Sequence, residues 1–325
     1  MLRVSIARLT PKIPKIAVPA HMALVLCLPT PALCQRAPPP ALPATFANGV
    51  TTRADIPYRT IDGETLTLDL YLPSMRKGPH PAVVFVHGGG FVSGHSRMMG
   101  AATNFPEHLA ALAARGFVVA SIQYRLAPKA YFPAQVRDAK AAIAWLRDHA
   151  ADYNVAPSRV AIWGSSAGGT IAATVGTTCG VEMFEPEGAA RTKGKTCVQA
   201  VADWFGPITM DSPLITAAYL GCATHPDCDT RRHVASPASY VRHEMPPFLV
   251  LHGDSDELVP IDQSRQFAKL LKTAQVDTTL TIVAGAKHGL KAVDPAQQRS
   301  IIDDAMATLE TFLGRTIGSP ATVTR

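Results

Sequence analysis

Two residue spacings that proteins commonly use to bind zinc are missing from this sequence. Neither C-x-x-C nor H-E-x-x-H occurs in its 325 residues, and only six of those residues are cysteine. The sequence therefore argues against a zinc site of the common kinds, although it leaves other chemistry open.

Acidic residues are absent from the first 34 positions, which contain four basic ones, Arg3, Arg8, Lys12 and Lys15. The whole chain has 31 basic and 25 acidic residues and a formal net charge of +6. Without the four basic residues the count is 27 against 25, or +2. Such a balance gives no electrostatic reason to expect nucleic acid or an anionic membrane surface as a partner.

The start of the chain has the layout of a secretory signal peptide: a cationic beginning, an apolar stretch at 17–28 and small residues after it. We predict a signal peptide at 1–34, an extended proline-rich linker at 35–50, and a periplasmic or secreted protein. A disordered start is the alternative, and the large Leu33 disfavours a lipid anchor at Cys34. Because the apolar stretch is too short to cross a bilayer, we expect no stable membrane insertion.

Removal of this leader leaves an even number of cysteines, Cys179, Cys197, Cys222 and Cys228. In an oxidising compartment they could form two local disulfides, Cys179 with Cys197 and Cys222 with Cys228. Four cysteines allow three pairings, so the other two remain open.

Buried strands alternate with helices along the rest of the chain. Short apolar runs predict parallel strands at 82–86, 117–122, 160–163, 200–204, 248–251 and 279–283. Helical spacing of apolar residues is clearest at 134–151, 263–274 and 298–312, and residues 66–71 alternate as an antiparallel edge strand would. We therefore predict a single α/β catalytic domain at 51–325, with a mostly parallel central sheet between helices on both faces. Residues 180–195 and 211–243 lack a clean period and are predicted to be loops that wall a cleft.

A candidate nucleophile lies in the sequence Gly-Ser-Ser-Ala-Gly at residues 164–168. It matches the G-x-S-x-G nucleophile elbow, and it follows a predicted strand and precedes a small-residue helix start, as this motif requires. A sharp turn there lifts the middle serine clear of the backbone, which makes Ser166 the candidate and not Ser165. A Gly/Ser loop without chemistry is the alternative.

Backbone donors for an oxyanion are expected in the sequence His-Gly-Gly-Gly at residues 87–90, directly after a strand. Acyl transfer develops negative charge on a carbonyl oxygen, and glycines expose their N–H groups to it. We predict that Gly89, Gly90 and Ala167 form the oxyanion hole, and that His87 is structural. A flexible glycine loop is the alternative.

A serine hydroxyl needs a neutral histidine to accept its proton and a carboxylate to fix that histidine. Asp256 follows the strand at 248–251 and His288 follows the next strand, in the chain order Ser, Asp, His. Asp254 and Glu257 are alternative acids that could instead cap a helix, and His252 is the alternative base.

Taken together, these residues resemble the α/β-hydrolase superfamily, and within it the bacterial hormone-sensitive-lipase-like and feruloyl-esterase-like (BD-FAE) esterases. The resemblance runs from about residue 58 to 313 and rests on five segments, H-G-G-G-F, Y-R-L-A-P, G-S-S-A-G-G, D-W-F-G-P and H-G-D-S-D-E-L-V-P. Gln123 stands where the lipase-like group usually has Asp, and little sequence for a cap precedes the first strand. The first departure weakens assignment to the lipase-like group, and the second favours the feruloyl-esterase-like branch and an open cleft.

This resemblance implies a serine carboxylesterase that acts on a small-molecule ester, of the acetyl or feruloyl type, through an acyl-enzyme and without a cofactor. A serine peptidase on the same fold and a non-catalytic binding module are the alternatives. Trp204, at a strand end, could line the substrate pocket or belong to the core. Tyr124 and Arg125 are expected to brace a strand end, and Asp138 to lie on a helix that faces the sheet.

Overall fold

An eight-stranded sheet organises the protein in the computed structural model, which describes residues 39–74, 78–188, 194–222 and 227–318. The strand order is β1-β2-β4-β3-β5-β6-β7-β8. β1 and β2 are antiparallel to their neighbours, and the other strands pair in parallel. The strands are β1 (Thr51–Ile61), β2 (Glu64–Leu72), β3 (His80–Val86), β4 (Val118–Ile122), β5 (Val155–Ser165), β6 (Ala200–Trp204), β7 (Phe248–Gly253) and β8 (Thr278–Val283).

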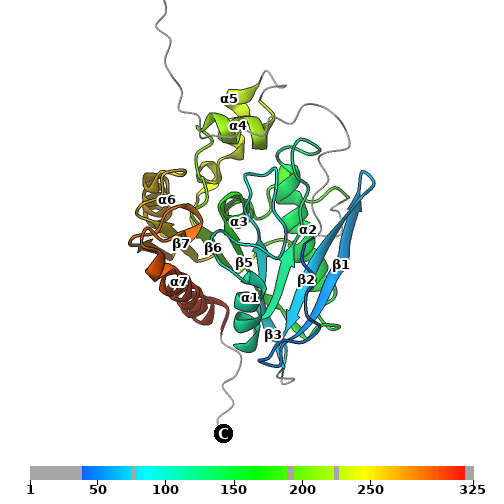
Figure 1. The fold of residues 1–325 in the computed structure, drawn as a ribbon. Helices are drawn as coiled ribbons and strands as arrows, with labels where there is room; N and C mark the ends of the chain where they lie inside the picture. The colour runs from blue at the N-terminus through cyan, green and yellow to red at the C-terminus, as the bar shows by residue number, and fades with distance from the viewer. Residues whose placement is uncertain (1–38, 75–77, 189–193, 223–226, 319–325) are drawn as a thin grey trace, which may run out of the picture. The chain divides into compact units, whose positions relative to one another are not determined.

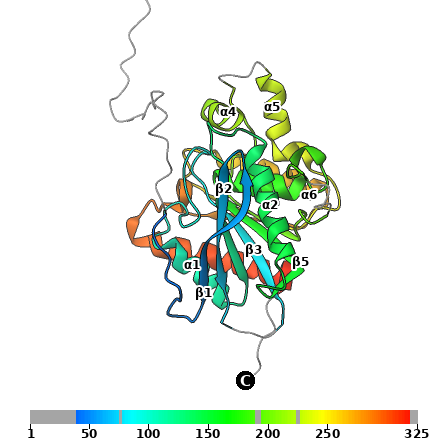
Figure 2. The ribbon, with the colours of Figure 1, turned by 90° about the vertical axis from the view of Figure 1, so that its right-hand side faces the viewer.

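Helices cover both faces of the sheet because the strands are apolar on both sides (Figures 1 and 2). In β3, Val84 packs into one buried cluster with α2, α3 and α6, whereas Val83 and Phe85 pack into the other with α1 and α7. This is the two-residue period of a strand buried on both faces. The helices are α1 (Phe105–Ala114), α2 (Ala134–Asp148), α3 (Ala167–Thr177), α4 (Pro213–Leu220), α5 (Cys228–Ala235), α6 (Ile261–Thr273) and α7 (Gln298–Leu313).

The predicted α/β fold is confirmed, and each of the six predicted parallel strands is present. The prediction of an antiparallel edge strand at 66–71 corresponds to β2, but β1 was missed. β1 is mostly exposed, and its pairing with β2 is shifted between Arg53 and Ile56 and between Pro57 and Arg59, so its sequence shows no clean alternation.

The prediction that 211–243 is loop is wrong in part, because α4 and α5 form there and lie together beyond one end of the sheet (Figures 1 and 2). Both helices are eight residues long. α4 is apolar along most of its length and α5 is strongly polar, so neither has the single apolar stripe that reveals a helix in sequence.

Both predicted local disulfides are present in the structure. Cys179 is bonded to Cys197, which ties the end of α3 to the chain before β6. Cys222 is bonded to Cys228, which ties α4 to α5. The crosslinks therefore lie outside the sheet, one around residues 180–195 and the other within 211–243, the two segments predicted to be loops.

Two buried ion pairs fix segments outside the strands against the rest of the domain. Arg125 donates to both carboxylate oxygens of Asp138, at 2.8 and 2.9 Å, so the Tyr124–Arg125 segment is braced against α2. Arg97 likewise binds the buried Asp69, and it donates to the Pro40 carbonyl at 2.6 Å. The part of the predicted linker that the structure describes thus contacts the domain, and the signal peptide prediction lies outside the described residues.

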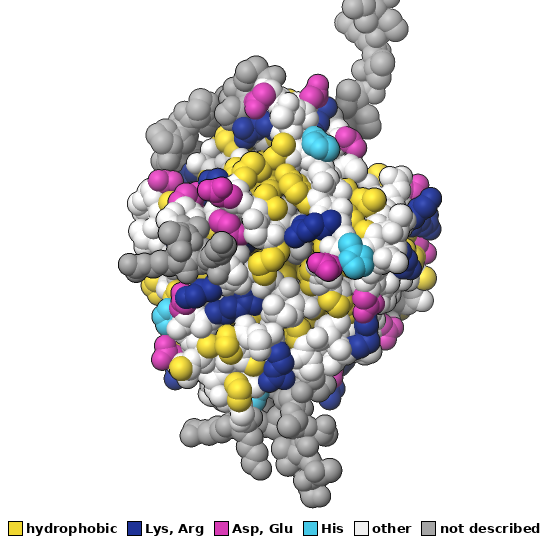
Figure 3. All heavy atoms as spheres, turned by 180° about the vertical axis from the view of Figure 1, so that it is seen from behind, with side chains coloured by type: hydrophobic (Ala, Val, Ile, Leu, Met, Phe, Trp, Pro, Cys, Tyr) yellow, Lys and Arg dark blue, Asp and Glu magenta, His cyan; other side chains and the backbone are white. Residues whose placement is uncertain are grey.

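Basic and acidic side chains are interspersed on the face that Figure 3 shows, with apolar side chains between them. This distribution agrees with the nearly balanced charge of the sequence after residue 34. None of the helices in the described part of the chain is long and apolar enough to cross a membrane.

Candidate active site

Ser166 lies at a sharp turn between β5 and α3, with a backbone φ of 54° and ψ of −121°. A non-glycine residue rarely adopts such a conformation, and it persists only where the surroundings enforce it. Here the backbone packs too closely for larger residues. A Cβ on Gly164 would lie 2.0 Å from the Gly168 carbonyl oxygen, and one on Gly168 would lie 2.0 Å from that of Val86. The elbow spacing in the sequence is thus a steric requirement.

His288 reaches Ser166 from the loop after β8. Its Nε2 lies 2.9 Å from the Ser166 hydroxyl oxygen, and its Nδ1 lies 2.8 Å from Oδ2 of Asp256. Because a carboxylate only accepts, Nδ1 carries the proton of a neutral imidazole and Nε2 is left to accept from the hydroxyl. The three side chains form a continuous hydrogen-bonded chain.

Asp256 is the acid that the structure places beside His288. Its other oxygen, Oδ1, accepts from the backbone N–H groups of Leu258 and Val259, both at 2.9 Å. The two alternative acids lie elsewhere: Asp254 accepts from Gly285, and the Glu257 side chain is 83% exposed beside Lys287.

Ionisation of Asp256 is strongly favoured. Burial acts against it, but hydrogen bonds from His252, His288 and the Val259 N–H outweigh burial and hold the pKa of Asp256 well below its usual range. This group can therefore stay charged while an imidazolium forms beside it.

His252, the alternative base, is fully buried behind Asp256 and does not face Ser166. Its Nε2 lies 3.1 Å from Asp256 Oδ2 and 3.0 Å from the Val259 carbonyl, and both are acceptors. Nε2 therefore carries a proton, and in the neutral ring Nδ1 accepts from the Ser264 hydroxyl at 2.7 Å. The position of His252 at a strand end, directly before a glycine, indicated a structural role in the sequence, but it did not reveal the contact with Asp256.

The predicted oxyanion donors are close to Ser166 in two of three cases. Gly90 and Ala167 line the same cavity as Ser166, and the first N–H groups of α3 have no acceptor within the helix. Gly89 is outside that lining, and its φ of 113° sets the turn that leads to Gly90. His87 stacks on Tyr124 at 4.4 Å between ring centroids, and the Tyr124 hydroxyl donates to the His87 carbonyl. His87 thus packs against the strand end.

A mainly apolar cavity of about 270 Å³ opens beside Ser166. Its mouth includes Val92 and Leu258, which are 46% and 62% exposed and are among the most exposed large apolar side chains. α4 contributes Ile215 and Ala218 to its wall. α4 is anchored next to the cavity, because its Tyr219 stacks on Phe91 with 3.9 Å between ring centroids.

Trp204 is fully buried in the core, where its ring packs against Trp163 at 4.8 Å between centroids. Of the two roles that the sequence left open, the structure places it in the core one. The cavity beside Ser166 is walled by α4, in the segment predicted to be loop.

Asp203 is a buried carboxyl behind the elbow. Its Oδ1 accepts from the Gly206 N–H at 3.0 Å, and its Oδ2 finds no hydrogen-bond partner among the described residues. Burial raises the pKa of Asp203 from 3.8 to about 7, against the opposing effects of His252 and the Gly206 N–H.

Replacement of Asp203 by asparagine is expected to change how stability depends on pH. Between about pH 4 and about pH 7 the folded protein keeps a proton that the unfolded chain loses, so this group favours folding at low pH and loses that effect as pH rises. As pH rises from about 4 to about 7, the free energy of unfolding of Asp203→Asn should therefore increase relative to that of wild type by up to about 4 kcal/mol. Urea unfolding of both proteins at several pH values measures the gain, and parallel pH curves would contradict it.

The fold and the hydrogen-bonded site are those of an α/β-hydrolase, and comparisons with known proteins assign the chain to the carboxylesterases of this fold. The chain belongs to the BD-FAE family, whose sequence profile matches residues 68–271. It is similar to two Mycobacterium tuberculosis esterases, LipQ (28% identity, 86% of this chain, 67% of LipQ) and LipC (32%, 67% and 55%). The chain thus spans about two thirds of LipQ and about half of LipC.

Two solved structures are similar over most of both chains. The "Truncated form of carbohydrate esterase from gut microbiota" is 28% identical with a TM-score of 0.68, over 83% of this chain and 100% of that one. Thermogutta terrifontis esterase 2, in a form phosphorylated by paraoxon, is 25% identical with a TM-score of 0.68, over 86% and 97%.

Proposed function

We propose that this protein hydrolyses carboxylic esters through a Ser166–His288–Asp256 triad and an acyl-enzyme. The observation that carries the proposal is the unbroken set of hydrogen bonds from the Ser166 hydroxyl through both ring nitrogens of His288 to Asp256. This is the arrangement that activates a serine hydroxyl for attack on a carbonyl.

In the first step the Ser166 oxygen attacks the ester carbonyl while His288 Nε2 takes the hydroxyl proton. The negative oxygen that forms accepts hydrogen bonds from the backbone N–H groups of Gly90 and Ala167, which line the same cavity as Ser166. Gly89 is the third predicted donor. His288 then gives its proton to the departing alcohol, which leaves an acyl group on Ser166. Water, deprotonated by the same ring, releases the acid in the second step.

The names of the similar proteins favour an ester over a peptide substrate. LipQ and LipC are both called esterases, and the solved structures similar to this chain include a carbohydrate esterase. An aminoacyl anilide that is cleaved faster than a nitrophenyl ester would support the serine peptidase alternative.

A small acyl group fits the cavity beside Ser166 best. Its volume of about 270 Å³ lies just under the range of about 300–1,000 Å³ for pockets that take drug-sized ligands. Its apolar walls suit an alkyl or aryl group and not a charged one. We therefore propose short esters as substrates, including acyl groups carried on carbohydrate.

Acyl-length preference should depend on Ile215 in the cavity wall. Wild type is expected to hydrolyse p-nitrophenyl butyrate faster than octanoate, and Ile215→Ala should raise the octanoate-to-butyrate ratio of kcat/KM. Each methylene that gains apolar contact contributes about 0.8 kcal/mol, close to fourfold. Leu270→Ala, on the exposed side of α6, is the control and should leave the ratio unchanged. An unchanged ratio in Ile215→Ala would remove the cavity from the acyl site.

We propose that the protein is exported and acts in the periplasm or outside the cell. Both disulfides support it, since such bonds persist in oxidising compartments. The predicted leader at 1–34 agrees with the same route.

A further inference from the structure

The loop that carries His288 has an unfavourable backbone directly after the histidine. Gly289 and Leu290 are both left-handed, with φ values of 73° and 59°. Leucine rarely adopts this conformation, and it persists where surrounding contacts hold it. The position of His288 therefore depends on groups outside the loop.

Gln298, the first residue of α7, supplies two such contacts with one side chain. Its Nε2 donates to the Leu290 carbonyl at 2.9 Å, and its Oε1 accepts from the Ala292 N–H at 2.9 Å. These atoms lie two and four residues beyond His288. Ala292 also bridges to Ala286 on the other side of the histidine, so the Gln298 amide restrains both ends of the turn.

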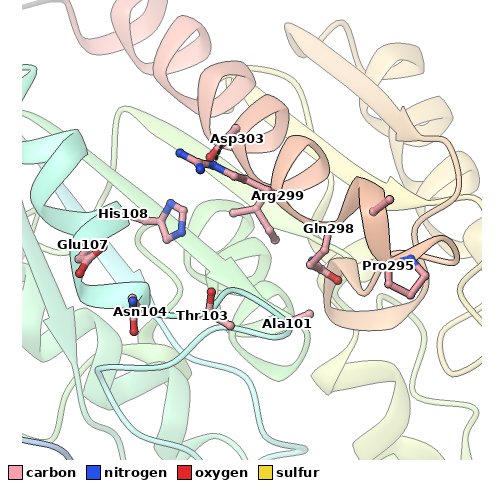
Figure 4. Close-up of a pocket in the computed structure, with 11 residues that line it drawn as sticks. Ala101, Thr103, Asn104, Glu107, His108, Pro295, Gln298, Arg299 and Asp303 are labelled. Carbon is pink, nitrogen blue, oxygen red and sulfur yellow. Dashed lines mark ion pairs between the residues drawn. The ribbon is translucent and has the colours of Figure 1, made fainter.

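A second contact reaches the turn from the segment before α1. The Ala101 N–H donates to the Gly289 carbonyl at 2.8 Å. Ala101 and Gln298 line one surface groove of about 510 Å³ between the first turns of α1 and α7, and Figure 4 shows both residues among those that line it. The groove is open, since the Arg299 side chain is 94% exposed.

We propose that Gln298 is a positioning residue of this esterase, which holds the His288 loop so that Nε2 stays aligned with the Ser166 hydroxyl. The proposal rests on the proposed function. It assigns Gln298 a role in catalysis through His288, without contact to substrate.

Only a neutral amide satisfies both backbone groups. A methionine of similar length would keep the packing but leave the Leu290 carbonyl and the Ala292 N–H unpaired. A glutamate would keep an acceptor for Ala292 but place a negative oxygen against the Leu290 carbonyl. Gln297, the preceding residue, is exposed, and among the described residues its side chain makes no hydrogen bond, so it provides a matched control.

The test compares Gln298→Met with Gln297→Met, with active sites counted by paraoxon labelling taken to its endpoint. We expect kcat per active site in Gln298→Met to fall between about tenfold and a hundredfold, with KM changed less than about twofold, because misplacement of the base slows chemistry more than binding. Gln297→Met should match wild type. Equal kcat in the two variants, or a lower melting temperature with unchanged kcat per site, overturns the proposal.

A spectroscopic readout separates this proposal from the proposed function. The His288 Nδ1 proton that is donated to Asp256 should give a low-field proton NMR signal in wild type and Gln297→Met, and the signal should shift or vanish in Gln298→Met. If wild type hydrolyses no ester, the proposed function fails, and the signal still decides whether Gln298 positions the ring. A signal that is the same in all three proteins overturns the proposal. Gln298→Glu, which keeps the acceptor for Ala292 but replaces the donor to Leu290 by a negative oxygen, replaces Gln298→Met if that variant does not fold.

Discussion

Ser166→Ala is expected to lower kcat for p-nitrophenyl butyrate by about a millionfold, to the level left by the oxyanion donors and binding alone. Without the hydroxyl, no acyl-enzyme can form and His288 has no proton to accept. The melting temperature should stay close to that of wild type, because among the described residues the hydroxyl makes a hydrogen bond with His288 alone. Steady-state hydrolysis of the nitrophenyl ester measures kcat, and thermal unfolding measures the melting temperature.

The neighbouring serine gives the control for this result. Ser165 is buried and has the same side chain, so Ser165→Ala changes the elbow equally little in volume and should keep most of the activity. Paraoxon, which phosphorylates the similar Thermogutta esterase 2, should label wild type and Ser165→Ala but not Ser166→Ala. Turnover or labelling that survives in Ser166→Ala would reject Ser166 as the nucleophile.

Asp256→Asn should cost on the order of 10⁴-fold in kcat. The N–H groups of Leu258 and Val259 require the amide oxygen to face them, so the NH₂ faces His288 Nδ1 and cannot accept from it. The ring therefore loses both its fixed tautomer and the charge that stabilises its protonated form. Steady-state kinetics with the same nitrophenyl ester measure the loss, and circular dichroism checks that the fold is kept.

The two alternative acids serve as controls for Asp256. Asp254→Asn and Glu257→Gln make the same kind of change within two residues, at carboxyls that the structure places away from His288. Each should lower kcat only a few fold. If either change costs as much as Asp256→Asn, the assignment of the acid is wrong.

The sequence sufficed to predict the fold and the three proposed catalytic residues because each of the three residues adjoins the carboxyl end of a parallel strand. β7 and the last part of β5 are buried apolar runs, which makes them visible in sequence, and β8 is a partly exposed edge strand rich in β-branched residues. Since parallel strands share one carboxyl edge, residues that follow them in chain order are brought to the same edge of the sheet.

The fate of Trp204 could not be predicted because it depends on which face of β6 the residue occupies. Ala200 and Ala202 share its face and pack into the cluster under α1 and α7, whereas Val201 packs into the other cluster. In a strand buried on both sides the sequence carries no mark of the face, since all these residues are apolar.

Gln298 was missed for a different reason. It begins a helical pattern, where an exposed polar residue is the ordinary expectation. Its two bonds to the His288 loop follow from the direction in which α7 starts, which the sequence does not state. The wall formed by α4 was missed because so short a helix with apolar residues on every side resembles a loop.

The elbow and the cavity wall differ in how freely evolution can change them. A Cβ on Gly164 or Gly168 would meet backbone oxygens at 2.0 Å, so almost any replacement there would displace the backbone that carries the chemistry. α4, by contrast, lies beyond the end of the sheet and is joined to α5 by its own disulfide. Changes in this one segment would therefore alter which esters the enzyme accepts, while the residues that carry out the reaction stay the same.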